Sequence, residues 1–267
     1  MQTFGFVGVG NMGYPMLQGA IKVFGRENVI YTDASAGRLE YVKNKTGIDY
    51  LTNNKAVVTR AKYIILAVKP QYFDTVFKEI KDHLTKDKIV IYLSPGITIA
   101  DYKESLGSDI RIVRAMPNTP AMVNEGMTAI CYSHDVFTDE EKSTLDTFFK
   151  SFGKYEVLEE KLMNAIACAS GSSPAYVYMF IEALADSAVK YGIPRDKAYK
   201  FVAQTVIGSA KMVLETGEHP GALKDMVCSP GGTTIEGVSA LEEFGFRNAI
   251  IKATDACYNK ANRMKDK

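Results

Sequence analysis

Three glycines, Gly8, Gly10 and Gly13, follow directly on an apolar run within Thr3–Gly13, TFGFVGVGNMG. The run is rich in Phe and Val, which is typical of a buried strand, and residues 11–24 carry apolar side chains at helical spacing. In such a strand–turn–helix unit the first glycine makes the turn, the second lets the backbone approach a pyrophosphate, and the third lets the helix pack closely. The free N–H groups of the first helical turn favour an anion. The pattern predicts a dinucleotide-binding loop, although the glycines of an ordinary loop could show the same spacing.

Alternation of strand and helix continues after this loop. Further apolar runs, separated by helical segments, lie at 28–32, 63–68, 89–93 and 110–115. Regular alternation indicates a doubly wound parallel sheet, and the run at 127–132 is expected to close it. From about Glu159 the strand pattern stops and helices follow one another. We therefore predict an α/β fold with a Rossmann domain over residues 1–158 and an all-helical domain over 159–267.

One helix of the second half is unusual in composition. Residues 174–191, PAYVYMFIEALADSAVKY, are apolar on most sides of the helix. A helix of this kind is buried around its whole circumference, which indicates packing in a bundle or against a second subunit.

Bulk composition restricts the class of partner. Hydrophobic residues make up 46% of the chain, enough for a real core, and 32 Lys and Arg oppose 31 Asp and Glu. A net charge of +1 gives no field to recruit nucleic acid or an anionic membrane, so the expected partner is a small molecule. The four cysteines are far apart and lack metal-ligand spacing, so we expect reduced thiols and no metal. Without a leader pattern or a membrane-length apolar run, we expect a cytoplasmic protein.

Candidate ligand residues lie after the strands, because open α/β sheets bind ligands at the carboxyl ends of their strands. These loops begin near Gly8, Asp33, Lys69, Ser94 and Met116. An acid such as Asp33 can bind the ribose 2′-hydroxyl and so favour NAD. Ser35 and Arg38 could instead receive a 2′-phosphate, and an Asp in a turn needs no cofactor.

A second glycine-rich loop, Ser229–Thr234, precedes a helix near the end of the chain. Its N–H groups and hydroxyls form a second anion site suited to a carboxylate, unless they simply cap the helix. Asn118 could bond a nicotinamide or ribose, or bond its own turn. Lys69, at the carboxyl end of a strand, could sit beside a cofactor or be merely solvated, and His219 is expected to be structural.

The segments GFVGVGNMG, AVKPQ, RAMPNTPAMV, SGSSPAYVYMFIEALAD and GALKDMVCSPGGTTIEGVSALEEFGFR occur in this order along the chain. Together they resemble the pyrroline-5-carboxylate reductase family over essentially the whole length. The resemblance implies a Rossmann domain, a helical domain that interlocks with its twin in a homodimer, and assembly into larger rings such as decamers. It also implies NAD(P)H-dependent reduction of L-1-pyrroline-5-carboxylate to L-proline, the last step of proline biosynthesis.

The resemblance also assigns residues. The resemblance implies cofactor binding at the glycine loop and the neighbouring strand ends, at Gly8, Gly10, Asn11, Met12, Asn54, Ala67, Val68, Lys69, Pro70 and Asn118. Asp33 and Ser35 join the candidate cofactor residues through their position after the second strand. Substrate binding is implied for Ser229, Gly231, Gly232, Thr233 and Thr234. Thr234 would reach the ring nitrogen as an orienting partner, and Glu218 would polarise the site. Members generally use NADPH and often accept NADH. Asp33 should repel a 2′-phosphate, and Met226 stands where some members carry Asn, so these two positions depart from the family pattern.

Two other classes of function compete with this interpretation. The β-hydroxyacid dehydrogenases place a helical lysine beside a glycine-rich substrate loop, but GSSPAYVYMFIE contains no lysine. A dinucleotide-sensing binding protein would keep Gly8–Gly13 and have no reason to keep Ser229–Thr234. Both alternatives are tested by mixing the protein with NAD(P)H and pyrroline-5-carboxylate. A reductase oxidises the nucleotide and its absorbance falls, whereas proteins of the other two classes leave the absorbance unchanged.

Overall fold

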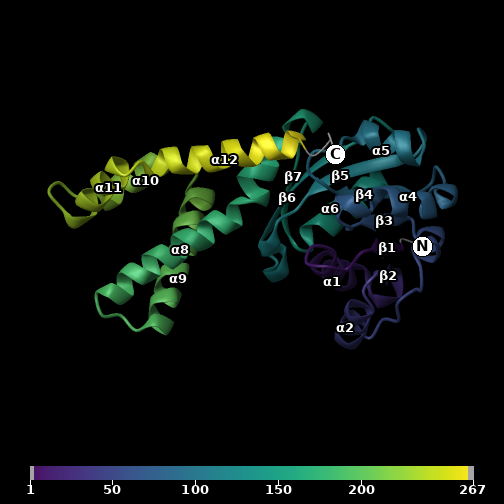
Figure 1. The fold of residues 1–267 in the computed structure, drawn as a ribbon, viewed down its shortest axis with the longest axis horizontal. Coiled ribbons are helices and arrows are strands. Elements are labelled where there is room, and N and C mark those ends of the chain that lie inside the picture. Colours follow the sequence, from purple (N-terminus) through teal and green to yellow (C-terminus); the bar gives the residue numbers. More distant parts are fainter. Residues whose placement is uncertain (1–2, 264–267) are drawn as a thin grey trace. The chain divides into compact units, whose positions relative to one another are not determined.

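The structure, a computed structural model, describes residues 3–263 and divides into two compact units (Figure 1). The sheet unit is Met1–Ser172 together with Tyr258–Lys267, and the helical unit is Ser173–Cys257. The predicted domain boundary at 158/159 thus lies before the boundary between the two compact units, which follows Ser172. Met163 and Ala167 are buried in the core of the sheet unit, which holds the segment before Ser173 there.

The sheet unit contains a seven-stranded sheet in the order β2-β1-β3-β4-β5-β6-β7. Its strands are β1 (Phe4–Val7), β2 (Val29–Thr32), β3 (Tyr63–Leu66), β4 (Ile89–Leu93), β5 (Arg111–Met116), β6 (Gly126–Tyr132) and β7 (Gly153–Val157). Strands β1 to β5 are parallel, β6 runs antiparallel to β5, and β7 runs parallel to β6. This topology confirms the predicted Rossmann sheet. Strand β7 was not predicted, and it, rather than 127–132, forms the edge.

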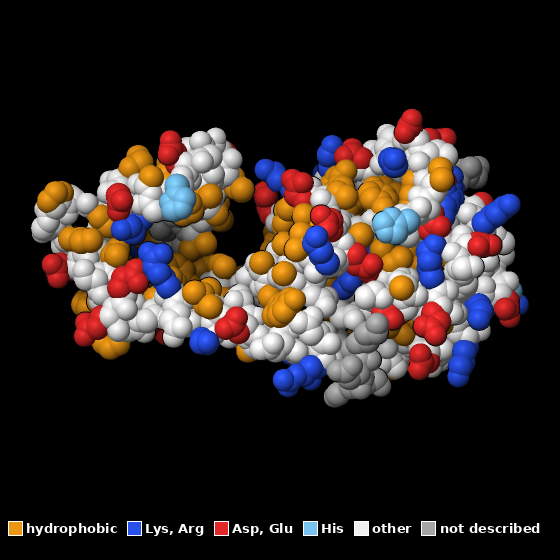
Figure 2. Space-filling model, turned by 90° about the horizontal axis from the view of Figure 1, so that it is seen from above, with side chains coloured by type: hydrophobic (Ala, Val, Ile, Leu, Met, Phe, Trp, Pro, Cys, Tyr) orange, Lys and Arg blue, Asp and Glu red, His pale blue; other side chains and the backbone are white. Residues whose placement is uncertain are grey.

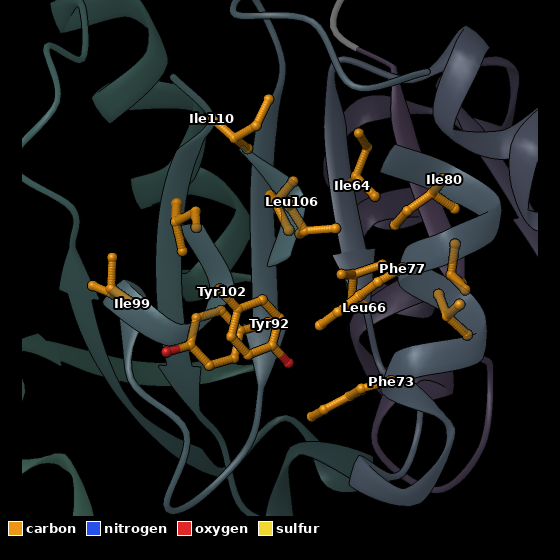
Figure 3. Close-up of a cluster of buried hydrophobic side chains, with 14 of the residues drawn as sticks. Ile64, Leu66, Phe73, Phe77, Ile80, Tyr92, Ile99, Tyr102, Leu106 and Ile110 are labelled. Atoms are coloured by element: carbon orange, nitrogen blue, oxygen red, sulfur yellow. The ribbon is translucent and has the colours of Figure 1, made fainter. Parts of the chain in front are cut away.

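Helices cover both faces of this sheet. They are α1 (Gly13–Phe24), α2 (Ala36–Thr46), α3 (Asn54–Arg60), α4 (Phe73–Ile80), α5 (Ile99–Leu106), α6 (Asp139–Lys150) and α7 (Met163–Ile166), followed by a π-helical turn at Ala167–Gly171. On one face α3, α4 and α5 cover a buried cluster, part of which is drawn in Figure 3, where Phe77 of α4 lies next to Leu66 of β3. On the other face α1, α2 and α6 bury a second cluster. Because both faces of the strands are covered, their sequences read as continuous apolar runs.

The helical unit is built from α8 (Ser173–Lys190), α9 (Arg195–Thr216), α10 (Pro220–Val227), α11 (Thr233–Glu243) and most of α12 (Phe246–Asn262). Among its described residues the buried hydrophobic cluster consists of Ala185, Ala198 and Val202. Large apolar side chains stay exposed, with Met179 at 68% and Phe244 at 85%. Figure 2 shows such hydrophobic side chains in orange on the helical unit, at the left of the view. The apolar circumference expected for 174–191 is therefore not covered within one chain.

Candidate functional site

The glycine loop between β1 and α1 has the geometry that its sequence requires. Gly8 has φ +92°, its N–H donates to Thr32 O at 3.0 Å, and a Cβ would lie 2.8 Å from Ala67 O. A Cβ on Gly13 would collide with the carbonyl oxygen of Gly8. At Gly10 none of the described residues comes within 4 Å of the Cβ position. Gly8 and Gly13 thus allow the turn and the close packing, while Gly10 faces open space.

Asp33 points back at this loop. Its Oδ2 accepts the N–H of Val9 at 2.8 Å, and its Oδ1 accepts the N–H of Ser35 at 2.9 Å. Both carboxylate oxygens therefore bind backbone donors. The carboxylate connects the end of β2 to the glycine loop, a role that its position in the sequence did not reveal.

Arg38 of α2 holds the same loop from its other side. Its Nε donates to Val9 O at 2.5 Å and its Nη2 to Gly10 O at 3.3 Å. The guanidinium lies 4.9 Å from the ring centroid of Tyr14 and 4.8 Å from that of Tyr41, within cation–π range. Asp33 and Arg38 together bind the N–H and the C=O of Val9, so two side chains hold the loop in this conformation.

A cavity of about 590 Å³ opens along the carboxyl ends of β2, β1, β3 and β4. Most of the predicted cofactor residues line it: Gly8, Gly10, Asn11, Met12, Asp33, Asn54, Ala67, Val68, Lys69 and Pro70. Sequence reasoning missed Tyr72, Thr75, Val76 and Glu79, which follow the Lys69-Pro70 strand end, and Leu93 at the end of β4. Their place just after strands was the signal that could have found them.

Three predicted cofactor residues have protein partners of their own. Asn54 Nδ2 donates to Glu79 Oε2 at 2.6 Å, across the cavity wall. Ser35 caps α2 through a hydrogen bond from Arg38 N, and it is not among the lining residues. Asn118 is also outside the lining.

Asn118 joins two segments of the sheet unit. Its Oδ1 accepts the N–H of Met127 at 2.9 Å, and its Nδ2 donates to Ser170 O at 3.1 Å in the π-helical turn. The side chain thus connects the start of β6 to this turn. Its contact with a nicotinamide stays a prediction.

The second glycine-rich loop leads into α11. Gly231 has φ +68°, Gly232 N donates to Ser229 O at 3.0 Å, and a Cβ on Gly232 would collide with Ser229 Oγ. Gly232 is the N-cap, and within residues 3–263 no side chain caps this helix end. Thr233 and Thr234 begin the helix, so their N–H groups lack intrahelical partners. The loop thus offers backbone donors and two hydroxyls rather than a side-chain cap.

Glu218 and His219 lie in the turn between α9 and α10. The Glu218 side chain is exposed, and its N–H donates to Thr216 Oγ1 at 3.1 Å. His219 Nδ1 accepts the N–H of Gly221 at 3.0 Å and caps α10. His219 has the structural contact that its sequence context predicts.

Metal-binding clusters and membrane-spanning helices are both absent from the described residues. No group of three or more His, Cys, Asp or Glu is arranged there to hold a metal ion, and no helix there is long and apolar enough to cross a membrane. None of the four cysteines, all of which lie within the described residues, forms a disulfide bond. Burial raises the pKa of the Cys131 thiol, which makes it a weak nucleophile.

Comparison with known proteins gives the class first. A model of the family "NADP oxidoreductase coenzyme F420-dependent" matches residues 3–96, which hold the glycine loop. Together with the full-length relatives below, this match shows an NAD(P)-dependent oxidoreductase. A second model, pyrroline-5-carboxylate reductase dimerisation, matches residues 160–264. The chain is also 48% identical to pyrroline-5-carboxylate reductase of Escherichia coli (strain K12) over 266 residues, 98% of each chain. The chain belongs to the pyrroline-5-carboxylate reductase family.

Further relatives support this assignment. The reductase of Methanosarcina acetivorans is 41% identical over 260 residues, covering 95% of this chain and 96% of its own. A crystal structure of Plasmodium falciparum pyrroline carboxylate reductase with NADP bound matches with a TM-score of 0.89 and 34% identity, covering 98% of both chains.

Proposed function

We propose that this chain reduces L-1-pyrroline-5-carboxylate to L-proline with NAD(P)H, the last step of proline biosynthesis. The observation that carries the proposal is that one chain holds two helix N-termini free to bind anions, in different settings. The first opens on a cavity long enough to follow four strand ends, which suits a dinucleotide. The second, at Gly232–Thr234, is a short, partly exposed helix start that suits a small carboxylate.

Within the cavity we place the adenosine beside Asp33 and the nicotinamide beside Leu93, the two ends of its lining. NADPH is the proposed main cofactor, and NADH is an accepted alternative. The NADP-bound Plasmodium relative and the nearby Arg38 guanidinium support this choice. Asp33 argues less strongly against NADPH than its sequence position suggests, because both of its oxygens bind backbone N–H groups.

The bound dinucleotide would supply a hydride to the imine carbon, and the ring nitrogen would carry the proton that completes the amine. A protonated imine is already electrophilic, so the residues of this chain act mainly by orientation. The loop at Ser229, Gly231, Gly232 and Thr233 would hold the substrate carboxylate through N–H groups and hydroxyls. The Thr234 hydroxyl would contact the ring nitrogen, and exposed Glu218 would stabilise positive charge there.

Assembly belongs to the same proposal. The dimerisation model that matches 160–264 and the exposed apolar side chains of the helical unit support homo-oligomerisation. We propose a homodimer formed through the helical unit, with larger rings such as a decamer built from it, and a cytoplasmic location.

Substitution of Thr234 tests the site directly. We expect Thr234→Ala to lower kcat/KM for the imine by about 10- to 1,000-fold, the range for loss of one oriented donor. The measurement is oxidation of NADPH and of NADH by purified protein with pyrroline-5-carboxylate. Thr147→Ala is the matched control, because its hydroxyl is exposed and bonds Ser143 O of α6. A wild-type protein that oxidises neither nucleotide would refute the proposed function, and unchanged Thr234→Ala kinetics would remove Thr234 from the mechanism.

A further inference from the structure

Arg114 of β5 is a buried cation at the carboxyl end of the sheet, with 2% of its surface exposed. Its Nη1 lies 3.3 Å from Glu160 Oε1, and its Nη2 donates to Asn164 Oδ1 at 2.9 Å and to Ser94 O at 3.5 Å. A buried charge lowers stability unless it is paired and hydrogen-bonded, and an apolar residue of similar size is often as stable. The arrangement around Arg114 therefore suggests a role beyond stability.

The partners of Arg114 hold the loop that follows β4, at 94–97. Asn164 Oδ1 accepts the N–H of Gly96 at 3.1 Å as well as the Arg114 hydrogen bond. Tyr92 OH donates to Ile97 O at 3.0 Å, and Ser94 is fully buried. This loop is thus fixed from β4, β5 and α7. It begins one residue after Leu93, which lines the cofactor cavity.

The other end of the Asn164 amide contacts a distant part of the chain. Asn164 Nδ2 donates to Asn262 Oδ1 at 2.9 Å, in the last turn of α12. The chain leaves the sheet unit after Ser172 and returns to it at Tyr258. One side chain therefore joins the outgoing segment, the returning segment and the loop after β4.

We propose that Asn164 is a positioning residue for hydride transfer. Its oxygen, held by buried Arg114, fixes loop 94–97 beside the nicotinamide, and its nitrogen fixes the returning end of α12 to the same point. The inference rests on the proposed function, since it needs the nicotinamide to lie beside Leu93. Small displacements of reacting groups reduce turnover strongly without reducing binding, so the effect should appear in kcat.

Three substitutions separate the two ends of the amide. Asn164→Leu removes both, Asn164→Asp keeps the acceptor for Gly96 and Arg114, and Asn262→Ala removes only the contact to α12. We expect Asn164→Leu to lower kcat by about 10- to 100-fold while the KM for NADPH changes by less than about 3-fold. Asn164→Asp should keep kcat within about 3-fold of the wild type, because the loop stays held. Asn164→Asp and Asn262→Ala both lose the hydrogen bond to α12 and both keep the acceptor for the loop, so Asn262→Ala should match Asn164→Asp.

Glu141→Gln is the matched control, because it breaks a buried ion-pair network elsewhere in the sheet unit and should lower Tm without changing kcat. Asn164→Leu with normal kcat and lowered Tm would overturn the inference, and so would Asn164→Asp with the same kcat loss as the leucine variant. If Asn164→Leu does not fold, Asn164→Ala takes its place, because it also removes the acceptor for Gly96 and Arg114. The inference then stands only if the alanine variant has a lower kcat than the aspartate variant. Wild-type turnover is measured in parallel, so that its absence identifies failure of the proposed function itself.

Discussion

The two units of this chain bury their apolar side chains to very different extents. The sheet unit has clusters on both faces of its sheet that include fully buried Phe4, Leu66 and Phe148. The helical unit has a described cluster of three small or medium residues and leaves Met179 and Leu214 exposed at 68% and 71%. Exposed apolar area of this extent marks an interaction surface. The sheet unit buries its core within one chain, whereas the helical unit leaves apolar side chains exposed that the proposed homodimer would cover.

The largest expected effect comes from a charge on the exposed face of α8. Met179→Glu should dissociate the homodimer, because burying an unpaired charge at an interface costs about 2–4 kcal/mol or more. Activity should fall with the fraction of dimer when enzyme is diluted, and sedimentation velocity would report the monomer.

Val136→Glu is the control for this substitution. Val136 is 84% exposed in the sheet unit, so the added charge stays in water and should change neither assembly nor activity. A Met179→Glu protein that remained a fully active dimer would show that this face of the helical unit is not an interface. It would contradict the claim that the helical unit, unlike the sheet unit, buries its apolar side chains against another chain.

A second substitution tests whether the sheet unit is stable through its own contacts. Burial alone would raise the pKa of Glu141, but hydrogen bonds from Arg111, Thr138 N and Lys62 lower the pKa to about 2. The folded pKa lies below the unfolded value, so this stabilisation is present above about pH 4.5 and is lost as pH falls toward 2. Glu141→Gln should lower the free energy of unfolding by about 3 kcal/mol at neutral pH.

Denaturant titrations of wild type and Glu141→Gln at pH 7 and pH 3 would measure this. The difference between the two proteins should shrink at the lower pH, and the variant should remain dimeric. A constant difference at both pH values would show that the Glu141 charge does not provide the stabilisation.

The smallest expected effect concerns the loop that Asp33 and Arg38 hold. Asp33→Asn keeps the size of the side chain and weakens one of its two backbone hydrogen bonds. We expect the KM of both NADPH and NADH to rise about five-fold, equivalent to about 1 kcal/mol, with their ratio unchanged. Steady-state kinetics with each nucleotide would test this. A selective gain for NADPH would show instead that Asp33 acts mainly by repelling a 2′-phosphate.

Local pattern was enough to predict the parallel strands, because their buried faces leave continuous apolar runs such as Tyr63–Leu66. It failed at β7, GKYEV, because an edge strand with exposed Lys154 and Glu156 has no such run. The convergence of the glycine loop and the strand ends on one cavity was also predicted. The contact of Asp33 with the glycine loop was not predicted, because it depends on a hydrogen bond to Val9, 24 residues away in sequence. The contacts of Asn118 and Asn164 could not be predicted for the same reason, since their partners are also far away in sequence.

The return of the chain to the sheet unit at Tyr258 has a consequence for how this protein folds while it is being translated. Ala261 is buried and Asn262 bonds Asn164, so the nucleotide-binding half includes residues made after the whole helical unit. During translation that half cannot reach its final structure until this last segment has left the ribosome. A nascent chain stalled before Tyr258 would hold all seven strands without the segment that completes their unit.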